Sequence, residues 1–188
     1  WTGGQSTATA SNLAAGTYTV VATDANGCSL SETVTVTEPS AVSLTASVAV
    51  NANGTQISCH GSADGTATAV ASGGTGAFTY AWTGGQSTAT ASNLAAGTYT
   101  VLATDANGCS LSQTVTVTEP SAVSLTASVT SDYNGSQISC HGSADGEATA
   151  VASGGTGAFS FAWTGGQSTA TASNLAAGTY TVVATDAN

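Results

Sequence analysis

Apolar and polar residues alternate with a period of two along most of the chain. Leucine, alanine and valine alternate with small or polar residues over 42–48, and alanines alternate with larger residues over 66–72. Phe78, Tyr80 and Trp82 take alternate positions of a further segment. This alternation is typical of half-buried β-strands. We predict strands at 42–50, 55–59, 66–72, 77–83, 87–92, 98–105 and 109–118.

Turn-forming pairs separate the alternating segments. Gly73-Gly74, Gly84-Gly85 and Asn107-Gly108 are residue pairs typical of tight turns between strands. The stretch Leu-Ala-Ala-Gly-Thr-Tyr that ends at Tyr99 resembles the corner at which a sandwich tyrosine binds backbone through its hydroxyl. Short strands with frequent turns predict an all-β fold made of immunoglobulin-like β-sandwich domains.

The whole pattern repeats every 81 residues. Trp1, Trp82 and Trp163 share this spacing, and 163–188 is identical to 1–26. The only two prolines, Pro39 and Pro120, lie in a Thr-Glu-Pro-Ser motif that suits a joint between domains. We therefore predict three parts: 1–38, the C-terminal part of a repeat; 41–119, one complete repeat domain; and 122–188, a repeat domain that lacks its last strand.

Charge narrows the range of functions. The chain has 188 residues, no Lys or Arg, ten Asp and Glu, and a formal net charge of −10. Without fixed cations it has no means to neutralise phosphates, which excludes nucleic-acid binding. Its apolar runs span a few residues, far short of the roughly 20 of a membrane helix, so we expect no membrane insertion. The absence of a leader-like start suggests an internal piece of a longer protein.

The cysteines predict an oxidising compartment. If successive strands alternate in direction, the strand ending at Cys59 and the strand beginning at Cys109 meet at one end of the sandwich. We expect a disulfide between them, with Cys28 and Cys140 pairing outside this segment. A Cys28–Cys59 bridge across the joint and four free thiols remain the alternatives. Disulfides would place the protein outside the cell or on its surface.

The carboxylates suggest a calcium site. With Cys59 next to Cys109, Asp64 and Asp105 would share one end of the domain, and Glu38 would enter there from the joint. The next joint would repeat the set with Glu119, Asp145 and Asp186. Oxygen ligands without nearby cations suit Ca²⁺, although such residues also cap turns through their own backbone. We expect no other cofactor.

No nucleophile, base and acid form a recognisable catalytic set, so we predict that the chain is not an enzyme. One histidine per repeat, at 60 and 141, offers too few ligands for zinc. Trp82 is the best candidate for an exposed aromatic residue that binds sugar, against a place in the sandwich core.

The ordered motifs of the complete repeat resemble a known family. They are Ile57-Ser58-Cys59-His60-Gly61, Asp64-Gly65, Ser72-Gly73-Gly74-Thr75, Phe78-Thr79-Tyr80-Ala81-Trp82, Leu94-Ala95-Ala96-Gly97-Thr98-Tyr99, Asp105-Ala106-Asn107-Gly108-Cys109 and Thr118-Glu119-Pro120. Together they resemble the SprB repeat of large Bacteroidetes surface proteins, whose namesake is a gliding adhesin. The resemblance implies a secreted, surface-attached repetitive protein exported by the type IX route, with a role in adhesion, gliding motility or filament formation.

Two functions follow as hypotheses. The first is a structural array that forms a cell-surface adhesin stalk or an extracellular filament, because a spacer needs the same unit many times. The second is a multivalent module that binds polysaccharide or a solid surface through weak repeated contacts. Low charge and the lack of edge lysines also predict self-association into a fibre or bundle.

Overall fold

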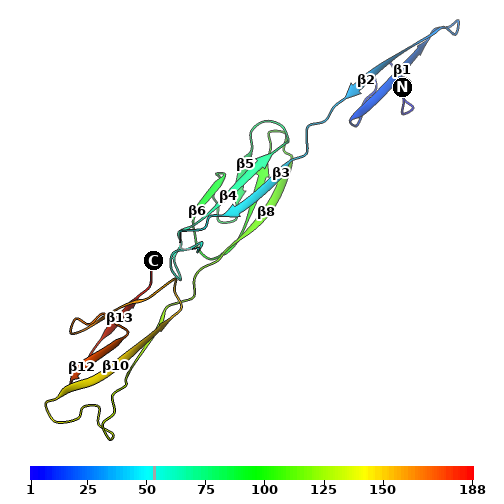
Figure 1. The fold of residues 1–188 in the computed structure, drawn as a ribbon. Coiled ribbons are helices and arrows are strands. Elements are labelled where there is room, and N and C mark those ends of the chain that lie inside the picture. Colours follow the sequence, from blue (N-terminus) through cyan, green and yellow to red (C-terminus); the bar gives the residue numbers. More distant parts are fainter. Residues whose placement is uncertain (53) are drawn as a thin grey trace.

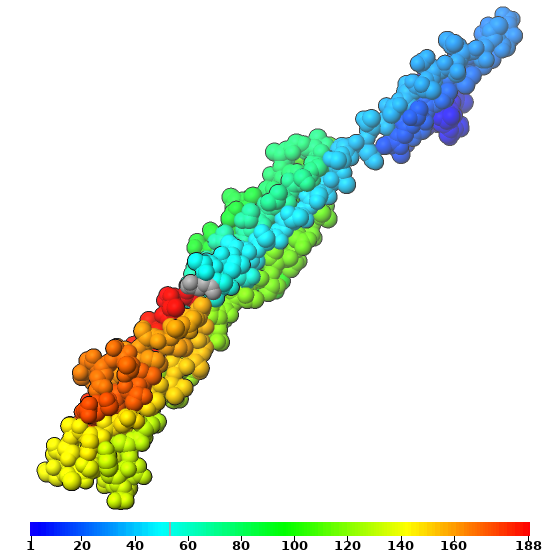
Figure 2. All heavy atoms as spheres, viewed as in Figure 1, coloured from blue at the N-terminus to red at the C-terminus, as the bar shows by residue number. Residues whose placement is uncertain are grey.

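The computed structural model describes residues 1–52 and 54–188 and shows an elongated molecule with three lobes in line (Figures 1 and 2). A hairpin of β1 (Gly16–Thr23) and β2 (Ser29–Val36) forms the first lobe. A thin linker leads to the middle lobe, and the third lobe follows it along the same axis. The C-terminus lies where the second and third lobes meet (Figure 1).

The middle lobe is a sandwich of two three-stranded antiparallel sheets. One sheet has the order β3 (Ser43–Val48), β4 (Gly65–Ser72) and β6 (Thr90–Leu94). The other has the order β5 (Thr79–Trp82), β7 (Gly97–Thr104) and β8 (Ser110–Val117). The all-β sandwich predicted from the alternating pattern is therefore confirmed.

The core of the middle lobe is small and rich in alanine. Trp82 is 5% exposed, and Ile57 and Val101 are fully buried beside it. Alanines at alternate positions of β4 complete the cluster, because a small side chain lets the two sheets approach closely. Threonines cover the solvent face, where their β-branch suits an exposed strand.

The path of the chain differs from simple alternation in two places. Residues 55–59, predicted to be a strand, lie in the connection between β3 and β4 and form no strand. In addition, β5 and β6 run in the same direction. Strand β5 is antiparallel to β7 and β6 is antiparallel to β4, while β4 and β7 both run towards the first lobe. The chain thus passes from one sheet to the other without turning back.

This path fixes which loops share an end of the sandwich. The entry end, facing the first lobe, holds the loops 73–78 and 105–109. The exit end, facing the third lobe, holds residues 49–52 and 54–64 of the connection between β3 and β4, and the end of β8. Thr118, just after β8, donates its N–H to Gln56 Oε1 at 2.7 Å, which ties the last strand to that connection.

The third lobe repeats the fold with fewer strands. Its sheets have the orders β9–β10–β12 and β11–β13. The bounds are β9 (Ser124–Val129), β10 (Ala144–Ser153), β11 (Ser160–Trp163), β12 (Thr171–Ala176) and β13 (Val182–Thr185). Nowhere in the described chain does a helix long and apolar enough to cross a bilayer occur.

Candidate functional site: the joints and the open edge

The entry end is organised around Asp105, a carboxylate 5% exposed. Its Oδ2 accepts the N–H of Thr75 at 2.8 Å, and its Oδ1 accepts the N–H groups of Asn107 and Cys109 at 2.9 and 2.8 Å. These bonds, that of Thr75 foremost, hold the pKa of Asp105 below its ordinary value, because they favour the ionised form. Asp105 therefore fastens two loops together.

The glycine pair of the same end receives the incoming linker. Gly74 N–H donates to Ser40 O at 2.8 Å, and Gly155 N–H makes the same bond to Ser121 O in the third lobe. Gly73 has φ +75°, and a Cβ there would lie 2.1 Å from Ala41 O. Glycine is thus required by both its backbone angle and the close approach of the linker.

The exit end of the middle lobe contacts the second joint, the Thr-Glu-Pro-Ser motif at 118–121 that leads to the third lobe. Glu119 Oε2 accepts the N–H of Gly61 at 2.6 Å, and its Oε1 lies 3.2 Å from His60 Nδ1. His60 Nδ1 also lies 3.2 Å from Pro120 O, while Asn188 donates its side-chain N–H to Ser58 O from the third lobe. The Glu-Pro dipeptide is therefore bonded to the exit end of the middle repeat, and Asn188 bonds the third lobe to the same loop.

The structure does not assemble the predicted calcium triads. Asp64 lies at the exit end of the middle lobe, whereas Asp105 and Glu38 line a shallow pocket at its entry end. Asp145 is likewise at the far end of the third lobe from Asp186, whose Oδ2 accepts the Thr156 N–H. Across residues 1–52 and 54–188, no three His, Cys, Asp or Glu side chains lie close enough to share an ion. The predicted grouping assumed that 55–59 crosses the sandwich as a strand, whereas the structure has no strand there.

Two of these aspartates have backbone partners instead. Asp64 Oδ1 accepts the N–H of Ser58 at 3.1 Å, and Asp145 Oδ1 accepts that of Ser139 at 3.2 Å. The hydrogen bonds from Ser58 and Ser139 lower the pKa of the respective carboxyl groups. Both residues stabilise the connection that follows the first strand of their repeat.

The expected Cys59–Cys109 disulfide does not fit the fold. All four cysteines are exposed and unpaired. Cys59 lies at the exit end near Val117, whereas Cys109 precedes Ser110 at the other end of β8. Eight strand residues span about 25 Å, while bridged Cα atoms lie within about 7 Å. Cys28 is further still from Cys59, because it lies in the turn between β1 and β2 of the first lobe.

Trp82 is a core residue and offers no face to a sugar. It is 5% exposed, and its Nε1–H donates to Thr88 O at 2.9 Å. The role of Trp82 as a ligand-binding aromatic is therefore corrected to a structural one. The tyrosine corner is confirmed, since Tyr99 Oη donates to Ala95 O at 3.1 Å.

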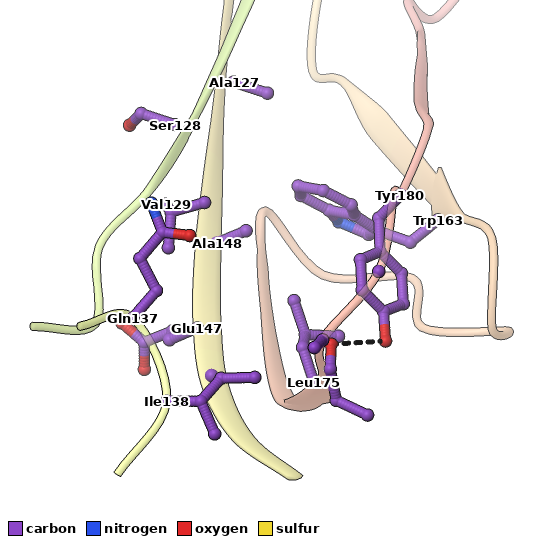
Figure 3. A pocket seen from close by; sticks show the side chains of 14 residues that line it. Ala127, Ser128, Val129, Gln137, Ile138, Glu147, Ala148, Trp163, Leu175 and Tyr180 are labelled. Atoms are coloured by element: carbon purple, nitrogen blue, oxygen red, sulfur yellow. Dashed lines mark hydrogen bonds between the residues drawn. The ribbon is translucent and has the colours of Figure 1, made fainter. Parts of the chain in front are cut away.

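The third lobe has a groove along its edge, lined by Trp163, Leu175, Ile138 and Tyr180 among others (Figure 3). Figure 3 shows the Trp163 and Tyr180 rings and the Leu175 side chain facing this space from one side, with β10 on the other. Sequence reasoning anticipated a missing strand here but assigned the resulting groove no role.

These observations define the class of protein: a tandem array of small β-sandwich repeats joined end to end by backbone contacts. Residues 51–87 and 133–168 match the family model of the SprB repeat, so these two stretches of the chain are similar to the SprB-repeat family. This is a structural repeat of the adhesin type, associated with cell-surface proteins. No curated protein matches the chain.

Proposed function

We propose that the chain is part of a non-enzymatic repeat array that forms a cell-surface adhesin stalk or an extracellular filament. The observation that carries this proposal is the second joint, where Glu119 and Pro120 contact the exit-end loop of one repeat and the next repeat lies in line with it. A joint held by hydrogen bonds keeps successive repeats in line, so that each repeat adds to the length of the array, as a stalk requires. Export by the type IX route and a part in gliding motility belong to the same proposal.

Length measurement tests this role. Eight strand residues span about 25 Å and a five-residue linker at most about 17 Å, so each repeat should add about 40 Å. Arrays of two, four and eight repeats should lengthen linearly in small-angle scattering and negative-stain images. Coiling of longer arrays into compact particles would contradict the stalk.

The alternative function, multivalent binding of polysaccharide or a solid surface, loses its best candidate residue because Trp82 is buried. A glycan array probed with the chain distinguishes the two. We expect no sugar signal that depends on the repeat number. Reproducible binding that grows with repeat number would favour the adhesive module instead.

Self-association into a fibre or bundle is part of the proposal. Leu30, Val70 and Val151 are more than half exposed on strand faces, and no Lys or Arg guards any edge. Light scattering at rising concentration should show particles larger than one chain.

A further inference from the structure

Strand β8 forms a long free edge of the complete repeat. It has eight residues at one side of its sheet, and no other strand of the described chain pairs with its outer side. The other edge strands of this repeat are shorter, with six residues in β3, five in β6 and four in β5. The ladder between β8 and β7 also has no register shift, whereas the ladder between β4 and β6 has one. Strand β8 is therefore the longest regular edge of the repeat.

The hydrogen bond that closes the turn before β8 shows which backbone groups point outwards. Asp105 N–H donates to Cys109 O at 2.9 Å, so these two residues form a hydrogen-bonded pair of the ladder. Such pairs alternate along antiparallel strands, so the odd-numbered residues of β8 bond to β7. The N–H and C=O groups of the even-numbered residues therefore point away from β7. These residues are all exposed: Ser110, Ser112, Thr114 and Thr116.

Strand β8 has none of the features that keep a strand edge from pairing with another chain. Natural edges are protected by charged residues, above all lysine, by proline or by bulges. Strand β8 has no charged residue, no proline and no bulge, and the chain has no lysine at all. The carboxylates nearest in sequence, Asp105 and Glu119, bind backbone N–H groups of the loops at the two ends. A strand with matching donors and acceptors can therefore pair with this edge without meeting a charge on it.

We propose that β8 pairs edge to edge with β8 of a second copy of this chain, antiparallel and about a twofold axis, so that two three-stranded sheets become one. This inference rests on the self-association proposed above and names its surface. A single symmetric register pairs every outward residue, with Ser110 opposite Thr116 and Ser112 opposite Thr114 of the other copy. Gln113 then lies on the axis, opposite the same residue of the other copy, with the two Cα atoms about 4.5 Å apart.

The repeats differ at the residue that lies on this axis. Strand β2 is the counterpart of β8 one repeat earlier and differs from it only by Glu32 in place of Gln113. Two glutamates opposite each other would repel, because like charges directly across a strand pair are destabilising. Residue 113 therefore sets the specificity: repeats with glutamine pair, and repeats with glutamate do not. Backbone bonds supply the affinity, and the contributions of several glutamine repeats in one array add up.

A proline tests the backbone contact. Sedimentation velocity of the 188-residue chain should show a monomer that becomes a dimer as the concentration rises. Ser112→Pro removes an N–H group from the outer edge and none from the ladder to β7, so the repeat should fold. Its dimer should be weaker by about tenfold or more, because the lost donor occurs twice in each dimer. Ser112→Ala, the matched control, keeps the N–H group and should dimerise like the wild type. The NMR signal of the Trp82 indole N–H, which donates to Thr88 O, reports the fold of each variant.

Charge at residue 113 tests the register. Gln113→Glu and Gln113→Lys should each stay monomeric at concentrations at which the wild type dimerises, because like charges would meet on the axis. An equimolar mixture of the two variants should dimerise again, because opposite charges would meet there.

Three results would overturn the pairing of β8 with β8: a wild-type chain that stays monomeric up to its solubility limit, an undiminished dimer of a folded Ser112→Pro variant, or a mixture of the two charged variants that stays monomeric. Particles that form regardless of these variants would leave self-association standing through another surface. The stalk proposal is tested separately by the length series.

Discussion

Individual residues of this repeat act mainly by binding backbone. Asp105 accepts three N–H groups, Glu119 accepts one from the exit-end loop of its own repeat, and Trp82 and Tyr99 each donate to a carbonyl. A chain without Lys or Arg has no strong side-chain cations to pair with its carboxylates. Backbone N–H groups take that place, and the loops at each end of the repeat are held as a result.

The first prediction concerns Asp105 and pH. Because its pKa is lowered in the folded state, its contribution is complete above the ordinary aspartate pKa of about 4 and is lost as the pH falls through the lower folded value. Asp105→Asn should lower the urea midpoint at pH 7. The difference in urea midpoint between this variant and the wild type should shrink as the pH falls towards 2. Asp24→Asn, in the hairpin without a Thr75 counterpart, is the control. Equal pH profiles for wild type and Asp105→Asn would contradict this role.

The second prediction separates backbone angle from close contact at a glycine. Gly73 and Gly85 both have positive φ, but only a Cβ on Gly73 would meet backbone, at 2.1 Å from Ala41 O. Gly85→Ala should cost about 1 kcal/mol of unfolding free energy from the left-handed backbone alone. Gly73→Ala should cost clearly more and loosen the joint, as urea unfolding and small-angle scattering would show. Equal losses would mean that the linker does not rest on Gly73.

At the scale of elements, alternation and turn residues were sufficient to predict all six strands of the middle repeat, together with a seventh at 55–59 that does not form. These patterns could not predict in which direction each segment of the chain runs through the sandwich. The segment 55–59 has an apolar residue at Ile57, yet this side chain fills the core from a loop. A period-two pattern shows which residues face inward, but not whether a short segment crosses the sandwich, and every candidate site at the ends depended on that crossing. The joint contacts of His60 and Gly61 with Glu119 lie 58 or more residues apart and leave no local signal.

The third prediction measures the contribution of β8 to the complete repeat. Val117 is 2% exposed, so Val117→Ala should lower the free energy of unfolding by about 2 kcal/mol through lost burial and a cavity. Val70→Ala, the same substitution at a position 61% exposed on β4, should stay within about 0.5 kcal/mol. Denaturant unfolding measures both. Similar costs for the two variants would mean that β8 does not close the core.

On the scale of the whole molecule, the path of the chain places the two cysteines of a repeat at opposite ends of the sandwich. The complete repeat places Cys59 at its exit end and Cys109 at its entry end. At a joint between two complete repeats, the counterpart of Cys59 from one repeat therefore faces the counterpart of Cys109 from the next. The bond from Asn188 to Ser58 O shows how near they come. Asn188 is the counterpart of Asn107, and Cys109 follows Asn107 by two positions. In an array that continues with this period, the disulfide would therefore cross the joint.

The fourth prediction follows from this placement. We extend the chain after Asn188 by the sequence of residues 108–119 and oxidise it with glutathione disulfide, which takes up two electrons and two protons per bridge. Mass spectrometry after digestion with a protease that cuts at aromatic residues, since trypsin has no site, should find Cys59 linked to the appended cysteine. A Cys59→Ser variant of the same chain should lose that link and bend more freely at the second joint in small-angle scattering. A Cys59–Cys109 link would restore the pairing within one repeat, and it would require the connection 49–64 to reach the entry end, against the bond between Gln56 and Thr118.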